Sequence, residues 1–123
     1  MDSLQIEGIN KELVKFETVG GILGLAVVDE NGLTILSRLP RSIDERKFGA
    51  MAATILGAME TAILPFKEDL FNLTIEFDDS QIIIIRSRNN IVLVVLMEIE
   101  VDLGFILLEI EEILININNI IKG

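Results

Sequence analysis

Apolar residues recur along this chain with two different periods, and the changes of period predict the order of its elements. Over about residues 4–16, 43–64 and 102–120 they fall three or four positions apart, which is the spacing of an amphipathic helix. Between these stretches lie short apolar runs separated by turn-forming residues, as expected for β-strands. The predicted strands cover residues 22–28, 33–39, 70–77, 81–86 and 90–97. The expected order is helix, two strands, helix, three strands and helix.

Local signals mark the ends of the first two helices. Asp2 is followed three residues later by Gln5, and Ser42 is followed at the same distance by Glu45. Each pair has the spacing of a capping box, in which the side chains and backbone amides at a helix start bind each other. Pro65 is expected to end the second helix because it cannot continue the helical hydrogen bonds.

Two turns can also be predicted. Asn31-Gly32 lies between two apolar runs and indicates a tight hairpin in which both turn residues take positive φ. The four residues from Asp29 to Gly32, which include this pair, resemble the start of a calcium-binding loop. The remaining oxygen ligands of such a loop are missing, which favours a plain turn. Arg88-Asn89-Asn90 suits a second tight turn, because asparagine tolerates left-handed backbone angles.

The second predicted helix has almost no polar face in its middle turns. Gly49, Ala53 and Gly57 follow one another at four-residue steps, and apolar residues fill another side. A surface helix normally keeps one polar face, and a domain of 123 residues seldom buries a helix all round. We therefore expect a second chain to cover part of it. The helix residues expected at that interface are Phe48, Met51, Ala52, Ile55, Met59 and Ala62.

The later strands differ in how they alternate. Phe71, Leu73 and Ile75 alternate with polar residues in strand 70–77, which indicates one covered face, whereas residues 81–86 and 90–97 show no alternation and are expected to be covered on both faces. Asp102 can cap the last helix, whose expected buried residues are Ile106, Ile110, Ile113, Ile117 and Ile120. The prediction is a single α+β domain over residues 1–123, with an antiparallel five-stranded sheet between helices on both faces.

Charge and composition narrow the function classes. The net charge of -10 disfavours nucleic acid and anionic membranes as partners. The one modest basic cluster, Arg41, Arg46 and Lys47, could contact an acidic or phosphate-bearing partner or simply be solvated. The longest uncharged run, residues 48–59, is shorter than the roughly 20 residues of a membrane span. Because the N-terminal segment also lacks the apolar core of a signal peptide, we expect a cytoplasmic protein.

The residue types needed for most catalysis are absent. The chain contains no His, Cys, Tyr or Trp, which removes the commonest general base, the thiol nucleophile and the soft metal ligands. We therefore expect no enzyme activity, no cofactor and no metal site.

Three segments carry a resemblance to a known family: GILGLAVVDENGLTILSR, the small-residue stretch ERKFGAMAATILGAMETAI, and IVLVVLMEIEVDLGFILLEI. In their order and spacing they resemble the roadblock family, small domains related to dynein light chains and to bacterial and archaeal regulators of Ras-like GTPases. The resemblance covers about residues 4–121. It implies the strand order 2-1-5-4-3, with the first and third helices on one face of the sheet and the second helix on the other.

The resemblance also implies an assembly and a function. Roadblock domains usually form dimers in which the second helices pack antiparallel and the third strands pair edge to edge, which would place Phe71, Leu73 and Ile75 at the interface. Such dimers serve as platforms for a small GTPase or a motor component. The expected function is a homodimeric adaptor for a small Ras-like GTPase, with modulation of GTP hydrolysis as an option. The alternatives are a structural dimerisation module, which could pair with a paralogous subunit, and a small-ligand sensor or minor enzyme that uses carboxylates.

Overall fold

The computed structural model describes residues 1–122. The elements follow the predicted order, with one short 3₁₀ helix added after the second helix. Their bounds are α1 Ser3–Glu17, β1 Ile22–Val28, β2 Thr34–Arg38, α2 Glu45–Ala62, η1 Leu64–Phe66, β3 Leu73–Glu76, β4 Ser80–Arg86, β5 Val92–Glu98 and α3 Leu103–Lys122.

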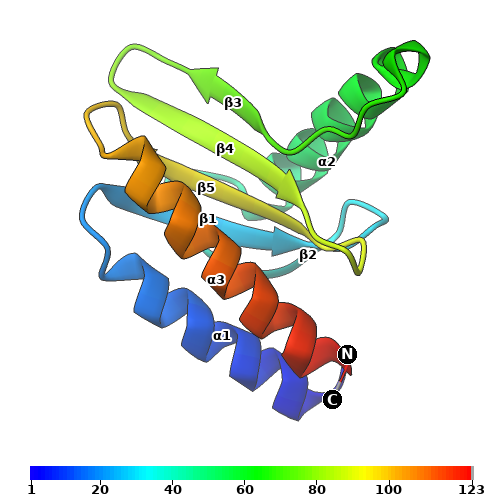
Figure 1. Ribbon diagram of the computed structural model, residues 1–123. Coiled ribbons are helices and arrows are strands. Elements are labelled where there is room, and N and C mark those ends of the chain that lie inside the picture. The colour runs from blue at the N-terminus through cyan, green and yellow to red at the C-terminus, as the bar shows by residue number, and fades with distance from the viewer. Residues whose placement is uncertain (123) are drawn as a thin grey trace.

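The five strands form one antiparallel sheet in the order β2-β1-β5-β4-β3 (Figure 1). The central strand β5 pairs with β1 on one side, where Ala26 faces Val94, and with β4 on the other, where Ile83 faces Val95. β2 and β3 are the edge strands. The strand order and the single sheet are therefore confirmed.

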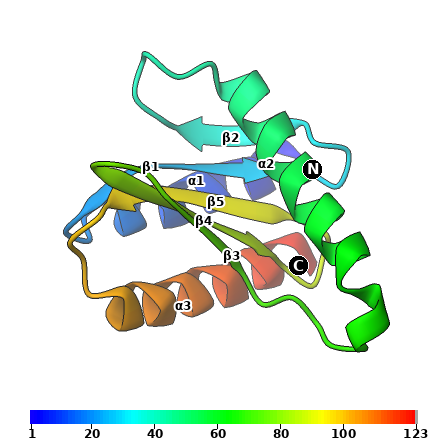
Figure 2. The ribbon, with the colours of Figure 1, turned by 90° about the horizontal axis from the view of Figure 1, so that it is seen from above.

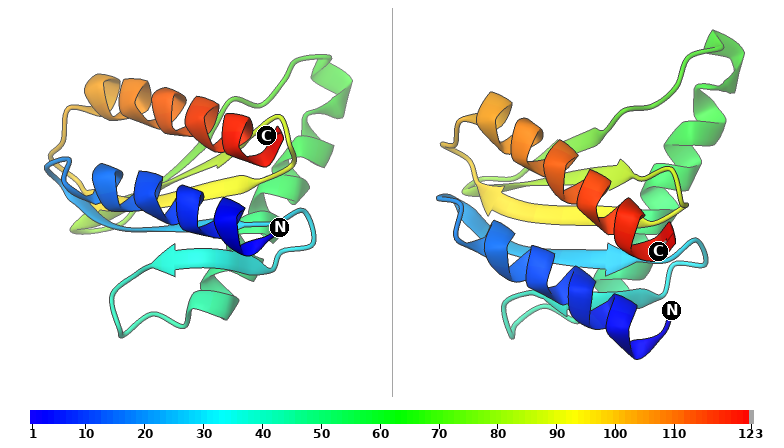
Figure 3. Two further views of the ribbon diagram at one scale, coloured as in Figure 1. Left: turned by 90° about the horizontal axis from the view of Figure 1, so that it is seen from below. Right: turned by 60° about the horizontal axis from the view of Figure 1, so that its bottom comes forward.

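Helices cover both faces of the sheet, so there are two hydrophobic cores. α1 and α3 lie side by side on one face, and α2 crosses the other (Figures 1 and 3). In β4, Ile83 belongs to the core under α1 and α3, whereas Ile82 and Ile84 belong to the core under α2. Successive side chains of a strand point to opposite faces. The run of isoleucines without alternation thus results from a strand buried on both sides.

The caps of α1 and α3 agree with the prediction, but the cap of α2 does not. Asp2 and Gln5 form the expected capping box, and the Asp102 carboxylate accepts a hydrogen bond from the Phe105 amide at 3.1 Å. The capping box predicted at Ser42 and Glu45 is wrong. The backbone amide of Ile43 instead donates to the carbonyl of Pro40, which makes a turn before the helix begins.

Asp44 is the residue that caps α2. Its carboxylate accepts hydrogen bonds from the backbone amides of Arg46 and Lys47 at 3.1 and 3.2 Å. The helix therefore starts at Glu45, two residues later than the hydrophobic pattern predicted. Asp caps helix starts well because its short side chain reaches the free amides of the first turn.

The β1–β2 hairpin forms where it was expected, with a different turn. Gly32 has a φ of 82°, but Asn31 does not take positive φ, so the prediction for Asn31 is wrong. The Gly32 amide donates to the Asp29 carbonyl, and the Asp29 amide donates to the Leu33 carbonyl. The Asp29 carboxylate also accepts from the amides of Asn31 and Leu33 at 2.8 and 3.0 Å. These bonds build a three-residue loop with glycine at the left-handed position.

The other turn agrees with the sequence, and β3 is shorter than predicted. Asn90 has a φ of 60°, as expected for the β4–β5 turn. β3 covers only Leu73–Glu76, so Phe71 precedes the strand rather than lying in it. Its predicted position within an alternating strand is wrong because residues 70–72 connect to η1 and have no strand partner.

Candidate interaction surface on the second helix

α2 approaches the sheet closely through its small residues. Gly49, Ala52 and Leu56 are the buried residues of the helix. A Cβ atom at Gly49 would collide with the Thr34 hydroxyl of β2 and lie 3.1 Å from Val28 Cγ2. Glycine is therefore needed at this position for the helix to reach the strands. Ala52, expected at an intermolecular interface, is instead buried in the chain's own core and is only 5% exposed.

One flank of α2 remains apolar and exposed. Met51, Ile55 and Met59 succeed one another at four-residue steps and are 53%, 42% and 39% exposed. Residues at that spacing lie on one side of a helix. Phe48 is half-buried against the core, and Ala62 is exposed at the end of the helix. The sheet therefore leaves this flank of α2 uncovered, and its coverage by a second chain stays a prediction.

The apolar surface continues beyond the end of α2. The helix extends past the edge of the sheet (Figures 2 and 3). Leu64, Phe66 and Phe71, in and after η1, are 71%, 67% and 86% exposed. Of these, only Phe71 was predicted as an interface residue. The signal for the other two was the composition of the segment LPFKEDLF, which is too apolar for a simple connecting loop.

β3 offers hydrogen-bonding groups rather than apolar side chains. Leu73 and Ile75 are half-buried and pack against the core under α2. Thr74 and Glu76 point to the other face and are exposed. Among the described residues, 1–122, β3 pairs only with β4, so its outer edge carries backbone amides and carbonyls without strand partners there. Such an edge is suited to pairing with another strand.

The two ends of α2 differ in net charge: three basic residues outnumber Asp44 and Glu45 at the N-terminal end, and two acidic residues outnumber Lys67 beyond the other end. Arg41, Arg46 and Lys47 are exposed at its N-terminal end, and none forms an ion pair within residues 1–122. Glu68 and Asp69, also exposed, follow η1 beyond its other end. The acidic pair was missed by sequence reasoning, although its separation from the basic cluster is visible in the sequence.

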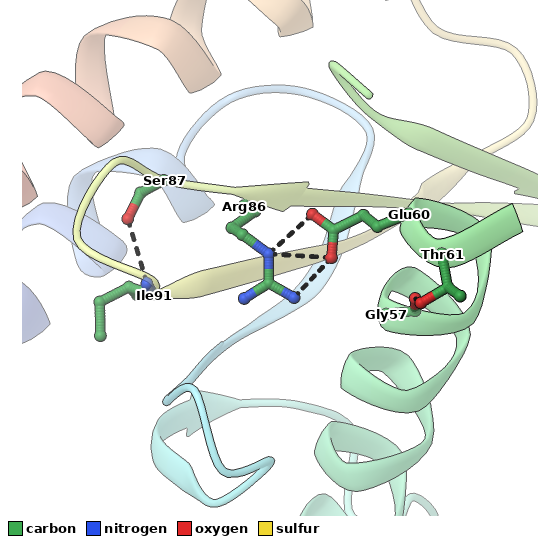
Figure 4. A network of polar contacts seen from close by, with 6 residues as sticks. All are labelled: Gly57, Glu60, Thr61, Arg86, Ser87 and Ile91. Carbon is green, nitrogen blue, oxygen red and sulfur yellow. Dashed lines mark hydrogen bonds and ion pairs between the residues drawn. The ribbon is translucent and has the colours of Figure 1, made fainter. Parts of the chain in front are cut away.

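An ion pair fixes the C-terminal half of α2 to the sheet. The Arg86 guanidinium of β4 donates to both carboxylate oxygens of Glu60, with distances of 2.9 Å from Nε to Oε2 and 2.9 Å from Nη2 to Oε1 (Figure 4). Both side chains are partly buried. Two parallel hydrogen bonds restrict orientation more than a single contact does. The exposed flank of α2 is therefore held in a defined position.

Within residues 1–122, no three carboxylates come together as a candidate metal site. No helix in the described part of the chain combines the length and the apolar character needed to cross a membrane. The Asp29 carboxylate, considered for calcium, is bonded to the amides of its own turn. The surface around α2 can thus offer apolar contact, charge at its ends and a strand edge.

Comparison with known proteins agrees with this architecture. A family model described as Roadblock/LC7 domain matches residues 9–97. This chain belongs to the Roadblock/LC7 domain family. Two proteins of Methanocaldococcus jannaschii, MJ0310 and MJ1340, are each 36% identical to this roadblock domain over 99 residues, which is 80% of this chain and 86% of theirs. A third protein from the same organism, MJ0714, is 33% identical to this chain over 99 residues. The match covers 80% of this chain and 83% of MJ0714.

Solved structures share the fold at low sequence identity. MglB of Myxococcus xanthus superimposes on this roadblock domain with a TM-score of 0.90 at 21% identity, covering 99% of this chain and 93% of MglB. A Roadblock/LC7 domain from Streptomyces avermitilis gives 0.80 at 14% identity, covering 99% and 98%. At these identities the likeness establishes the fold alone.

Proposed function

We propose that this roadblock domain is a non-enzymatic, cytoplasmic homodimeric adaptor that binds a small Ras-like GTPase. The observation that carries the proposal is the exposed apolar flank of α2, formed by Met51, Ile55 and Met59. Monomeric proteins seldom leave such contiguous apolar surface in water. Membership of the Roadblock/LC7 family supports the same conclusion.

The charges and the flank together favour antiparallel packing of two α2 helices. Met51 and Met59 lie four residues on either side of Ile55, so a two-fold axis near Ile55 would bring each methionine against the other in the second copy. The same axis would bring the N-terminal end of one α2, with Arg46 and Lys47, toward the C-terminal end of the other. Glu68 and Asp69 follow that C-terminal end. A parallel arrangement would place like charges together. The acidic partner of the basic cluster is then a second copy of this chain.

The edge strand supports the same dimer. β3 lies at the edge of the sheet, and the segment that follows η1 leads to it from the C-terminal end of α2 (Figure 2). In an antiparallel pair of domains, the two β3 strands can bind edge to edge and satisfy their free amides and carbonyls. Leu73 and Ile75 would then support the interface from the core under the paired strands, and Phe71 would lie at its rim.

A dimer of this kind offers a platform rather than a reaction centre. The absence of His, Cys and Tyr from the sequence is in accord with a binding role. A second candidate, a scaffold that pairs with a paralogous subunit, is favoured by one observation. The three relatives in Methanocaldococcus jannaschii occur in one organism, so several proteins with sequences similar to this one coexist there.

Two measurements test the proposal in order. Light scattering at micromolar concentration is expected to give twice the 13.7 kDa mass of one chain, and a stable monomer would contradict the dimer. The tagged protein is then purified from its own host, and any small GTPase that co-purifies is tested for binding in its GDP form and with a non-hydrolysable GTP analogue. We expect binding that depends on the nucleotide. A dimer that retains no GTPase in either state would support the scaffold instead.

A further inference from the structure

A groove of about 920 Å³ lies on the face of the sheet opposite α2. It runs between α3 and the segment just before β3, over the end of β4, and the β4–β5 turn closes one end. Figure 1 shows α3 lying in front of β5, with β4 and β3 extending beyond the helix on one side. The groove is lined by Leu70, Phe71, Asn72, Ile85, Arg86, Ser87, Arg88, Asn89, Leu107, Ile110, Glu111, Leu114, Ile115, Asn118, Asn119 and Lys122.

The middle of this α3 groove is apolar. Leu107, Leu114 and Ile115 line it from the helix, and Ile85 of β4 lines it from the sheet. Ile115 is 59% exposed, and Leu107 and Leu114 are only partly covered by the core. Phe71 lines the groove from the far side. A contiguous apolar surface of this kind on a small domain usually marks a binding site.

The end of the α3 groove near the β4–β5 turn is polar and positive. Arg88 and Lys122 line it, and neither forms an ion pair within residues 1–122. The Asn89 side chain donates a hydrogen bond to the Asn118 side chain at 3.3 Å, which joins the turn to α3. The carbonyls of Ile120 and Ile121, which would carry the negative charge of a helix end, accept hydrogen bonds from the Gln5 side chain.

The charge of the α3 groove is opposite to that of the whole chain. Arg86 does not add to it, because its guanidinium is paired with Glu60 on the other face of the sheet. Glu111 is the one acidic residue in the lining, against Arg88 and Lys122. The chain as a whole has twice as many acidic as basic residues, 20 against 10. A positive end on an acidic protein selects for negative charge in whatever binds there.

We propose that the α3 groove binds an acidic amphipathic segment of a partner protein. Apolar side chains of that segment lie between Ile115 and Ile85, and its carboxylates lie near Arg88 and Lys122. The groove volume is at the upper end of the roughly 300–1,000 Å³ that ligand pockets occupy, which suits several side chains of one peptide. Phe71 lies both in this groove and at the rim of the proposed dimer, so the test uses residues of α3 and the β4–β5 turn, which lie outside that dimer interface.

The test uses a displayed library of random 12-residue peptides selected on the full-length protein. Enriched peptides are synthesised, labelled and titrated by fluorescence anisotropy. We expect enrichment of peptides that combine apolar residues with Asp or Glu. Ile115→Ser should weaken their binding by more than about fivefold, and the double variant Arg88→Ala/Lys122→Ala by roughly two- to tenfold, with less dependence on salt. Leu33→Ser is the matched control, because Leu33 is also exposed but lies in the β1–β2 turn.

Several results would overturn this proposal. They are the absence of any enriched peptide, enrichment of basic peptides, and binding that Ile115→Ser leaves unchanged. A change of oligomeric state in Ile115→Ser would show instead that the groove is an interface between copies of the chain. The proposed α2 dimer is measured separately with α2 variants, so failure of one proposal does not imply failure of the other.

Discussion

Arg86 on β4 and Glu60 on α2 form a two-pronged ion pair in which Nε and Nη2 each lie 2.9 Å from a carboxylate oxygen. The pair joins the sheet to the part of α2 that extends past its edge (Figures 2 and 4). Thr61, one residue further along the helix, is exposed, and its hydroxyl donates to the Gly57 carbonyl of its own helix. Arg86 therefore anchors the end of the proposed interaction surface.

Arg86→Ala is expected to lower the free energy of unfolding by roughly 1–2 kcal/mol, between the values for exposed and buried charged hydrogen bonds. Arg86→Lys should recover only part of the loss, because an ammonium group cannot bind both oxygens in the same geometry. Urea denaturation followed by circular dichroism measures the effect. Arg88→Ala is the control, since Arg88 is exposed and has no ion pair among the described residues. Equal stability of the two alanine variants would contradict the anchoring role.

The two glycines of α2 should respond oppositely to alanine. At Gly57 an added Cβ meets no atom within 4 Å, so Gly57→Ala should stabilise the fold by about 0.5–1 kcal/mol through the higher helix propensity of alanine. At Gly49 the Cβ would collide with Thr34, whose hydroxyl donates to the Glu45 carbonyl at 2.9 Å. Gly49→Ala should therefore destabilise by about 1–3 kcal/mol. Thermal unfolding of both variants checks the sign, and stabilisation at both positions would contradict the close approach.

Hydrophobic pattern alone predicted most elements of this fold, because strands buried on one or two faces leave different patterns in the sequence. The run from Ile82 to Ile85 could be assigned to a doubly covered strand for this reason. The cap at Asp44 could not be predicted from the sequence, because Ser42 and Asp44 are both good capping residues. The turn from Pro40 to Ile43 places Asp44, rather than Ser42, at the start of the helix. The strand order came from the family resemblance, because pairing between distant strands leaves no local signal.

The candidate surface was predicted less completely than the fold. Periodicity identified the apolar side of α2 but not its rotation toward the sheet, so Ala52 was grouped with Ile55 although it lies in the core. The rotation is decided by Gly49, where the missing side chain lets the backbone approach β2. The α3 groove had no sequence signal, because its residues come from α3, β4, the β4–β5 turn and the segment before β3.

Ile55→Asp is expected to break the proposed dimer. Ile55 is exposed in the single chain, so the variant should fold, but each copy would carry an unpaired carboxylate into the interface. The dissociation constant should rise by about a hundredfold or more. Thr54→Asp is the matched control, because Thr54 is the adjacent exposed residue on another side of the helix. Analytical ultracentrifugation measures both, and an unchanged Ile55→Asp dimer would place the interface elsewhere.

Reversal of charge at one end of α2 tests the antiparallel direction. Changing Arg41, Arg46 and Lys47 to Glu should weaken self-association, because like charges would then meet at both ends of the dimer. Changing Glu68 and Asp69 to Lys should weaken it for the same reason. Each change should raise the dissociation constant of the dimer by roughly tenfold at low salt. Each triple or double change removes several exposed ion pairs across the interface, and each pair contributes less than about 1 kcal/mol to binding.

A mixture of the two charge-reversed proteins should recover association, since an acidic N-terminal end would meet a basic C-terminal end wherever one copy binds the other variant. At one end of such a heterodimer, the introduced Glu residues of one variant attract the introduced Lys residues of the other. At the opposite end, the unchanged acidic residues of the first variant attract the unchanged basic residues of the second. The recovery should fade as salt is added, because these side chains are exposed. Native mass spectrometry distinguishes the heterodimer from the two homodimers when one variant carries a mass tag. A purely statistical distribution, in which the heterodimer is only about twice as abundant as each homodimer, would show that charge does not set the direction of packing.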